Sequence, residues 1–268
     1  MTEVLALISG KGGVGKTLLT AAIGLSMGRA GARVLLIDCD AGMNNLDIPL
    51  GLSPGAPDFS DLADGRCFPE EAVQHAGSGV DFLGAPTGAD WRDLSKSAVM
   101  TVLEDMDGTY DYILLDCPAG MGKGLRFARR AASRMLIAAA PDPASLRAAR
   151  RMAGWAEGRA AVVLNDFGRP GGDPVSFEEA RVSLSLPWAG VVPHTEEAAR
   201  LAAEGRLSAA ADGVFWKAAG MVWKQWLTGA EYPLSLWETL LTRPVQKKEE
   251  GAVLLRRQRS ALWKRRRR

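Results

Sequence analysis

The sequence predicts a doubly wound, mainly parallel α/β sheet with helices on both faces. Short apolar runs alternate with longer stretches of helical or polar composition, which is the rhythm of βαβ units. The runs are continuous in Val, Ile, Leu and Ala, which is typical of strands covered by helices on both faces. The chain has 268 residues, of which 47% are hydrophobic, enough to bury the core of one α/β domain.

Seven apolar runs are expected to be strands. They span residues 4–9, 34–38, 80–83, 112–116, 135–140, 161–165 and 189–192. Ligands of such sheets bind outside the carboxyl ends of the strands, so the residues there are functional candidates. By position these are Gly10, Asp38, Asp116, Pro141 and Asn165.

The first expected strand leads into a glycine-rich loop and then into helix-forming residues from Thr17 to Met27. The loop reads Gly10-Lys11-Gly12-Gly13-Val14-Gly15-Lys16-Thr17, which satisfies the pattern G-x-x-x-x-G-K-[ST]. The glycines let backbone N–H groups converge on phosphate oxygens, the second lysine supplies a charge, and the threonine hydroxyl suits Mg²⁺. Strand, loop and helix in this order predict a nucleoside triphosphate site at the helix N-terminus.

Carboxylates end two other expected strands. Asp38 and Asp40 lie two residues apart, so on an extended backbone they share a face and can organise Mg²⁺-bound water and the attacking water. An ordinary turn at the strand end is the alternative. Four apolar residues precede Asp116, the form of a second Mg²⁺-contacting motif, and a Pro/Gly loop able to sense the γ-phosphate follows it.

In this order, the three motifs resemble those of the MinD/ParA family of deviant P-loop ATPases, in particular its cell-division site regulators. The matching segments are residues 11–17, 37–47 and 116–120, and later segments at 162–165 and 190–193 extend the likeness to about residues 1–210. The distinguishing mark is the early lysine, Lys11.

The resemblance implies an Mg²⁺-dependent ATPase that dimerises on ATP, with Lys11 reaching the partner's nucleotide. It implies that Lys16 holds phosphates, that Asp40 orients the attacking water, and that Thr17, Asp38 and Asp116 form the Mg²⁺ site. It also implies that the nucleotide is contacted by Gly10, Lys11, Gly12, Gly13, Val14, Gly15, Lys16, Thr17, Leu18, Asn165 and Pro193. Of these residues, Asn165 and Pro193 are the ones expected to contact adenine. Asn165 is also a routine turn residue.

Some positions depart from the family pattern. Leu18 replaces a frequent Ser or Thr, Asn44 replaces a frequent Arg, and residues 145–151 lack the aspartates of the family's partner-binding helix. The protein partner therefore stays unidentified at this point, and a binding protein with a degenerate site is an alternative to an ATPase.

The net charge of +2 hides two opposite parts. Residues 246–268 carry ten Lys or Arg and two Asp or Glu. Residues 1–245 therefore carry 23 Lys or Arg and 29 Asp or Glu, so this part is acidic and the end of the chain is basic. We therefore divide the chain into an ATPase domain, 1–245, and a basic tail, 246–268. Drawn as a helix, the tail gathers Leu254, Leu255 and Leu262, with Trp263 at one edge, which predicts an amphipathic anchor that is disordered until it meets an anionic membrane. DNA binding by the arginines, as in a ParA-like partitioning ATPase, is the competing interpretation.

The segment from about 208 to 241 is rich in tryptophan. Apolar residues at 215, 219, 222 and 226 make one helical stripe, which predicts a helix packed on the sheet, with a partner or membrane surface as the alternative. Residues 51–65 and 168–173 are expected to be turn-rich loops.

Three scattered cysteines, Cys39, Cys67 and Cys117, indicate reduced thiols. They give little support to an electron-transfer or metal-carrier protein. No apolar run approaches the roughly 18 residues needed to span a bilayer, so we expect a cytoplasmic protein that attaches to the inner face of the cell membrane. A regulator of flagellar number is the alternative role within the family.

Overall fold

The computed structural model describes residues 1–40, 45–53, 57–87, 96–120, 122–210 and 212–242. Within these residues, eight strands form one sheet in the order β3-β4-β2-β5-β1-β6-β7-β8. The strands are β1 Glu3–Ser9, β2 Val34–Asp38, β3 Gln74–Gly77, β4 Val80–Leu83, β5 Tyr112–Ala119, β6 Arg134–Ala139, β7 Ala160–Phe167 and β8 Trp188–Pro193. All neighbouring pairs are parallel except β3 with β4. The predicted doubly wound sheet is confirmed.

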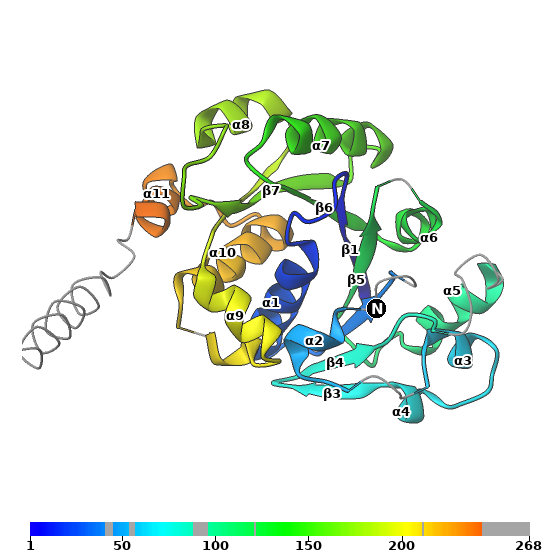
Figure 1. Ribbon diagram of the computed structural model, residues 1–268. Helices are drawn as coiled ribbons and strands as arrows, with labels where there is room; N and C mark the ends of the chain where they lie inside the picture. The colour runs from blue at the N-terminus through cyan, green and yellow to red at the C-terminus, as the bar shows by residue number, and fades with distance from the viewer. Residues whose placement is uncertain (41–44, 54–56, 88–95, 121, 211, 243–268) are drawn as a thin grey trace, which may run out of the picture.

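Helices cover both faces of the sheet (Figure 1). They are α1 Lys16–Arg29, α2 Asp47–Leu50, α3 Phe59–Ala63, α4 Pro69–Ala72, α5 Lys96–Asp105, α6 Lys123–Ala131, α7 Pro143–Trp155, α8 Phe177–Leu184, α9 Glu196–Ala203, α10 Val214–Thr228 and α11 Leu234–Thr242, with a 3₁₀ turn at Leu207–Ala210. Because β-α-β crossovers are right-handed, α1 lies on one face, and α6, α7 and α8 lie on the other. Helix α10 packs on α1 and β8, so it belongs to the first face.

The direction in which the chain builds the sheet reverses between β1 and β6. From β1 the chain continues to β2 on one side, and from β6 it continues to β7 on the other. In an open α/β sheet, the crevice outside the carboxyl ends of the strands at such a point is where ligands bind. The loop after β1 and the residues after β6 therefore border the expected site.

Three features differ from the expectation. The antiparallel strand β3 was not predicted, because its sequence, Gln-His-Ala-Gly, has no apolar run. Helix α3 lies inside the stretch expected to be a loop, and begins where the Asp58 carboxylate accepts N–H groups of the first turn. Strands β5 and β7 continue past Asp116 and Asn165, because Ala119 still pairs with Ser9 and Phe167 with Pro193, so neither residue ends its strand.

The tryptophan-rich segment forms α10 and α11 and belongs to the core. Trp216 and Trp226 of α10 are buried, and Trp237 of α11 is only 1% exposed, which confirms the packed helix. The Trp237 ring lies over Gly190 of β8, where an added Cβ would approach it to 2.4 Å. A residue without a side chain is therefore needed beneath the indole.

The described residues include all three cysteines and were searched for helices that could span a membrane. Cys39 and Cys117 are buried, Cys67 is half-buried, and all three are free thiols. In this part of the chain, no helix combines the length and apolar character that crossing a bilayer requires.

We expect Trp237→Ala to lower the free energy of unfolding by about 3–5 kcal/mol, because it removes a fully buried indole and leaves a cavity over β8. Urea denaturation measures the change. Leu236→Ala on the exposed side of α11 is the matched control, with an expected change within about 0.5 kcal/mol. Equal effects of the two substitutions would contradict the core role of Trp237.

Candidate functional site

The glycine-rich loop connects β1 to α1 through two glycines in the left-handed conformation. Gly13 and Gly15 have φ angles of 75° and 77°, in the left-handed region that glycine adopts without strain. Helix α1 begins at Lys16, and no side chain of the described residues caps its N-terminus. Its first N–H groups and the positive end of its dipole are thus left for an anion.

Neighbouring elements hold the loop closely. A Cβ on Gly10 would lie 2.7 Å from the Ala148 Cβ of α7, and one on Gly15 would lie 2.6 Å from the Asn165 amide nitrogen. The Asn165 Nδ2 group donates to the Val14 carbonyl at 2.8 Å. Its Oδ1 atom is buried and has no hydrogen-bond partner in the described part of the chain. That orphaned acceptor suits a ligand bound against the loop.

Asp116 of β5 joins three side chains of α1. It accepts from Lys16 Nζ at 2.5 Å, from Thr17 Oγ1 at 2.7 Å and from Thr20 Oγ1 at 2.8 Å. Burial disfavours the Lys16 ammonium, but the Asp116 carboxylate outweighs this and raises the pKa of Lys16. Lys16 therefore stays charged in a buried position, where a phosphate would also meet it.

Asp38 of β2 lies beside Asp116, because the two residues pair across the sheet. It is 1% exposed and accepts backbone N–H groups from Asp40 at 2.8 Å and from Asn45 and Leu46 at 3.1 Å. Burial, followed by the nearby Asp116 charge, raises the pKa of Asp38 to about 7. Asp38 thus binds the described residues on either side of 41–44, and it adds negative charge to the site above that pH.

Lys11 has a different environment from Lys16. Its side chain is 47% exposed and forms an ion pair with Asp142 at 3.0 Å. Asp142 also accepts from the N–H groups of Ala144 and Ser145 and so caps α7. The Lys11–Asp142 ion pair joins the loop after β1 to the residues after β6, where the direction of sheet building reverses.

The structure brings together most of the predicted site residues, but not all in the predicted way. Asp40 is half-buried just after β2, and Leu18 packs partly against the core. Pro193 is the last residue of β8, which β6 and β7 separate from β1. Asn44 and residues 41–43 lie outside the described residues.

Two residues of the site were not singled out from the sequence. Thr20 is fully buried and donates to Asp116, and the signal was its place one helical turn after Lys16. Asp142 binds Lys11, and the signal was a carboxylate directly after Pro141, which was a candidate by position. Neither Thr20 nor Asp142 belongs to a sequence motif.

The residues fit an Mg²⁺ ion bound together with a nucleotide. The Thr17 hydroxyl and the Asp116 carboxylate lie 2.7 Å apart, with Asp38 on the adjacent strand. Among the described residues, no cluster of three or more His, Cys, Asp or Glu could hold a metal. Mg²⁺ commonly uses one or two protein groups and takes its other ligands from phosphates and water, so this sparse set is the appropriate one.

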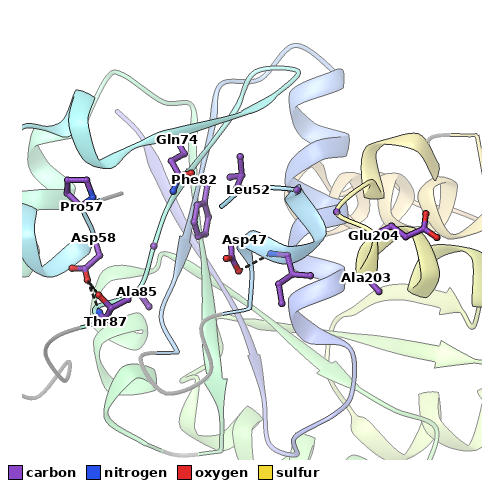
Figure 2. Close-up of a pocket in the computed structure, with 14 residues that line it drawn as sticks. Asp47, Leu52, Pro57, Asp58, Gln74, Phe82, Ala85, Thr87, Ala203 and Glu204 are labelled. Atoms are coloured by element: carbon purple, nitrogen blue, oxygen red, sulfur yellow. Dashed lines mark hydrogen bonds between the residues drawn. The ribbon is translucent and has the colours of Figure 1, made fainter. Parts of the chain in front are cut away.

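A cavity of about 570 Å³ lies elsewhere, between α2, β4 and the end of α9 (Figure 2). Its floor includes Phe82 and Leu52, and the described residues that line it include no lysine or arginine. Asp58 at its edge already accepts from Thr87 and from Ser60. With no cation to meet a phosphate, this cavity is not the nucleotide site.

Fold and site together define a P-loop nucleotide-binding protein. The family profile described as "CobQ/CobB/MinD/ParA nucleotide binding domain" matches residues 5–208. The chain therefore belongs to this family.

Its relatives include septum site-determining proteins. The chain is 32% identical to MinD of Thermotoga maritima over 210 residues, which are 74% of this chain and 77% of that protein. It is 29% identical to MinD of Bacillus subtilis over 217 residues, 76% of this chain and 81% of that protein. The predicted membership of the MinD/ParA family is confirmed.

Solved structures agree with the sequence relatives. The MinC:MinD complex of Aquifex aeolicus superposes with a TM-score of 0.75 at 30% identity, covering 87% of this chain and 98% of the matched chain. MinD of Pyrococcus horikoshii, complexed with Mg-ADP, gives a TM-score of 0.73 at 25% identity, covering 84% and 96%. Both confirm a MinD-like P-loop fold.

We expect Thr20→Val to weaken nucleotide binding and to destabilise the protein by about 1–3 kcal/mol, because it removes a donor from buried Asp116 without changing the side-chain volume. Thermal unfolding and titration with a fluorescent ATP analogue measure both effects. Thr20→Ser keeps the hydroxyl and is expected to restore most of the loss. A Val variant as stable as the wild type would show that Thr20 does not support Asp116.

Proposed function

We propose that the protein is an Mg²⁺-dependent ATPase switch that dimerises on ATP and returns to a monomer after hydrolysis. The observation that carries this proposal is the contrast between the two lysines of one loop. Lys16 is buried against Asp116, whereas Lys11 is half-exposed on Asp142. In this proposal Lys16 would meet the protein's own nucleotide, and Lys11 would reach the nucleotide of a second molecule.

The buried part of the site, around Lys16 and the N-terminus of α1, would bind ATP. Lys16 and the N-terminal N–H groups of α1 would meet the phosphates, and Asn165 and Pro193 would contact the base. Thr17 and Asp116, supported by Asp38, would hold Mg²⁺, which neutralises charge on the phosphate oxygens during phosphoryl transfer. Gly10, Gly12, Gly13, Val14, Gly15 and Leu18 contribute backbone to the same cradle.

Hydrolysis would depend on Asp40 and Lys16. The Asp40 carboxylate follows β2 on the same edge as Asp116, where it orients the water that attacks the γ-phosphorus. Lys16 stabilises the charge on the phosphoryl oxygens as the bond to ADP breaks. Positioning and electrostatic stabilisation account for most of the catalysis in reactions of this class.

Lys11, the half-exposed lysine of the loop, would couple dimerisation to ATP. Two nucleotides that face each other need added cations, and Lys11 from each subunit supplies one. Its ion pair with Asp142 is partly exposed, and such pairs contribute only about 0–1 kcal/mol, so the cost of leaving it is small. Loss of the γ-phosphate removes the charge that Lys11 would neutralise and favours separation.

The basic tail would attach the dimer to the inner face of the cell membrane. Leu254, Leu255, Leu262 and Trp263, which lie outside the described residues, supply the apolar side of the anchor, and the surrounding Lys and Arg meet anionic lipid. Two tails on one dimer bind more strongly than one, through effective concentration. The MinD relatives are septum site-determining proteins, which supports a role in spatial regulation of cell division with an unidentified effector protein.

We expect Asp40→Ala to reduce ATP hydrolysis by about 10²-fold or more while leaving ATP binding intact, which traps the ATP dimer. Adding Lys11→Ala to this variant is expected to yield monomers with ATP and ADP alike, because the cation between the nucleotides is lost. Analytical ultracentrifugation and phosphate release measure both. Lys217→Ala on α10 is the matched exposed-lysine control and should dimerise normally. If the Lys11 variant dimerises like the control, the proposed action across the dimer is wrong.

We expect the full chain to sediment with anionic vesicles in ATP and much less in ADP. Leu254→Glu with Leu262→Glu should abolish sedimentation, because it places carboxylates on the apolar face of the tail. Leu234→Glu with Leu236→Glu changes two exposed leucines of α11 by the same charge and should sediment normally. Retained vesicle binding by the tail variant, or duplex binding that depends on the tail and weakens steeply with salt, would favour DNA.

A further inference from the structure

The cavity between α2, β4 and the end of α9 has the size and lining of a small-molecule site (Figure 2). Its volume of about 570 Å³ lies within the roughly 300–1,000 Å³ that such sites occupy. Ile48, Leu52 and Phe82 give it apolar walls, and its described charged residues are all acidic. The cavity therefore suits a ligand with an apolar body and a positive charge.

Among the described lining residues, one carboxylate is free to meet such a charge. Asp58 and Glu204 already have side-chain partners. Within the described part of the chain, Asp47 accepts one hydrogen bond, from the Ile48 N–H group at 2.9 Å, and has no ion-pair partner. The amide of Gln74 also lines the cavity and has no partner among these residues. Asp47 is thus the group to which a ligand cation would bind, with Gln74 as a second polar contact.

One wall of the cavity is continuous with the candidate nucleotide site. Asp47 is the first residue of α2, and Leu46, directly before it, donates its N–H to the buried Asp38 carboxylate at 3.1 Å. Close packing holds the other end of α2, where a Cβ added to Gly51 would lie 2.3 Å from the Gly205 carbonyl oxygen. A ligand against α2 therefore stabilises the same position of Leu46 that supplies a hydrogen bond to Asp38.

We propose that this cavity binds a small apolar amine, with its ammonium group on Asp47 and its apolar body against Phe82, and that α2 couples this binding to the nucleotide. A ligand favours the arrangement of the protein to which it binds. The amine and Mg-ATP both favour α2 with Leu46 on Asp38, so each strengthens binding of the other by the same factor. The coupling rests on the proposed function, whereas the amine site does not.

The chain's own basic tail is the other cation that matches an acidic lining, but it fits less well. Residues 246–268 carry ten Lys or Arg. The described lining residues offer one carboxylate without an ion-pair partner, Asp47, which matches a single ammonium group. A small amine therefore satisfies the cavity, whereas the tail would leave most of its charges without a partner there.

The test measures binding of dansylcadaverine to the full chain by fluorescence. This probe carries a naphthalene ring on a flexible chain that ends in a primary ammonium group. Dansyl-aminohexanoic acid has the same ring on a chain that ends in a carboxylate, so it is the matched control. We expect saturable binding of the cationic probe and about tenfold or more weaker binding of the anionic one, because attraction to Asp47 becomes repulsion.

Two variants test the assignment to this cavity. A Cβ on Gly84 would make ordinary contact with the Phe82 ring, at 3.9 Å, so a leucine there can fill the cavity. Gly84→Leu is expected to weaken probe binding by about tenfold or more through steric exclusion. Asp47→Asn keeps the bond to Ile48 but removes the charge, and should weaken binding by about threefold to tenfold.

Each variant has a matched control outside the cavity. Gly154→Leu on the exposed side of α7 makes the same change in size, and Asp105→Asn on α5 makes the same change in charge. Both should change probe binding by less than about twofold. Probe binding that Gly84→Leu leaves unchanged, or equal binding of the two dansyl compounds, would refute the amine site.

A non-hydrolysable ATP analogue with Mg²⁺ tests the coupling. It should strengthen probe binding by about fivefold or more, and the probe should strengthen binding of the analogue equally. Independent binding of the two would overturn the coupling, whereas a protein that binds the probe but no analogue would contradict the proposed function and support the amine site alone. Stronger probe binding by the Leu254→Glu with Leu262→Glu variant would show that the tail fills the cavity, and would replace the amine with that segment.

Discussion

The buried carboxylate of Asp116 is the interaction on which the site depends. It lies in the middle strand pair of the sheet and receives Lys16, Thr17 and Thr20 from the first turns of α1. A buried ammonium without its partner is strongly destabilising, so the Lys16–Asp116 pair ties the position of the loop to the position of the sheet. Asp116 of β5 therefore holds the end of the glycine-rich loop in position, although no residue of β5 belongs to the loop.

The parallel register explains why this site calls for a cation. Pairing of β2 with β5 sets Asp38 beside Asp116, and both are almost completely buried. One ammonium, from Lys16, faces two carboxylates. The protein relieves the excess charge in part by raising the pKa of Asp38 to about 7, through burial and the neighbouring Asp116. A divalent cation held by Thr17 and Asp116 would relieve it more completely and would also neutralise charge on phosphate oxygens.

The sequence was sufficient for the strands of the parallel sheet, because each contains an apolar run, although β5 and β7 continue past Asp116 and Asn165, the residues expected to end them. It was insufficient for β3, whose pairing with β4 is set by the turn between them rather than by hydrophobicity. The loop pattern also singled out Lys16 and Thr17, and both contact Asp116 in the structure. Thr20, Asp142 and the Asn165 contact with Val14 depend on distances between elements far apart in the chain, which a pattern within one segment does not contain.

Basic residues that are scattered along the sequence lie together in the folded protein. Counted along the sequence, the body is acidic and the basicity lies in the tail, but folding collects the arginines of α6 and α7 on one face. Helix α7 begins at Asp142, which holds Lys11, and its exposed side carries Arg147 and Arg151. The Lys11–Asp142 pair therefore joins the glycine-rich loop to the start of this basic helix, and the proposed ATP dimer would release it.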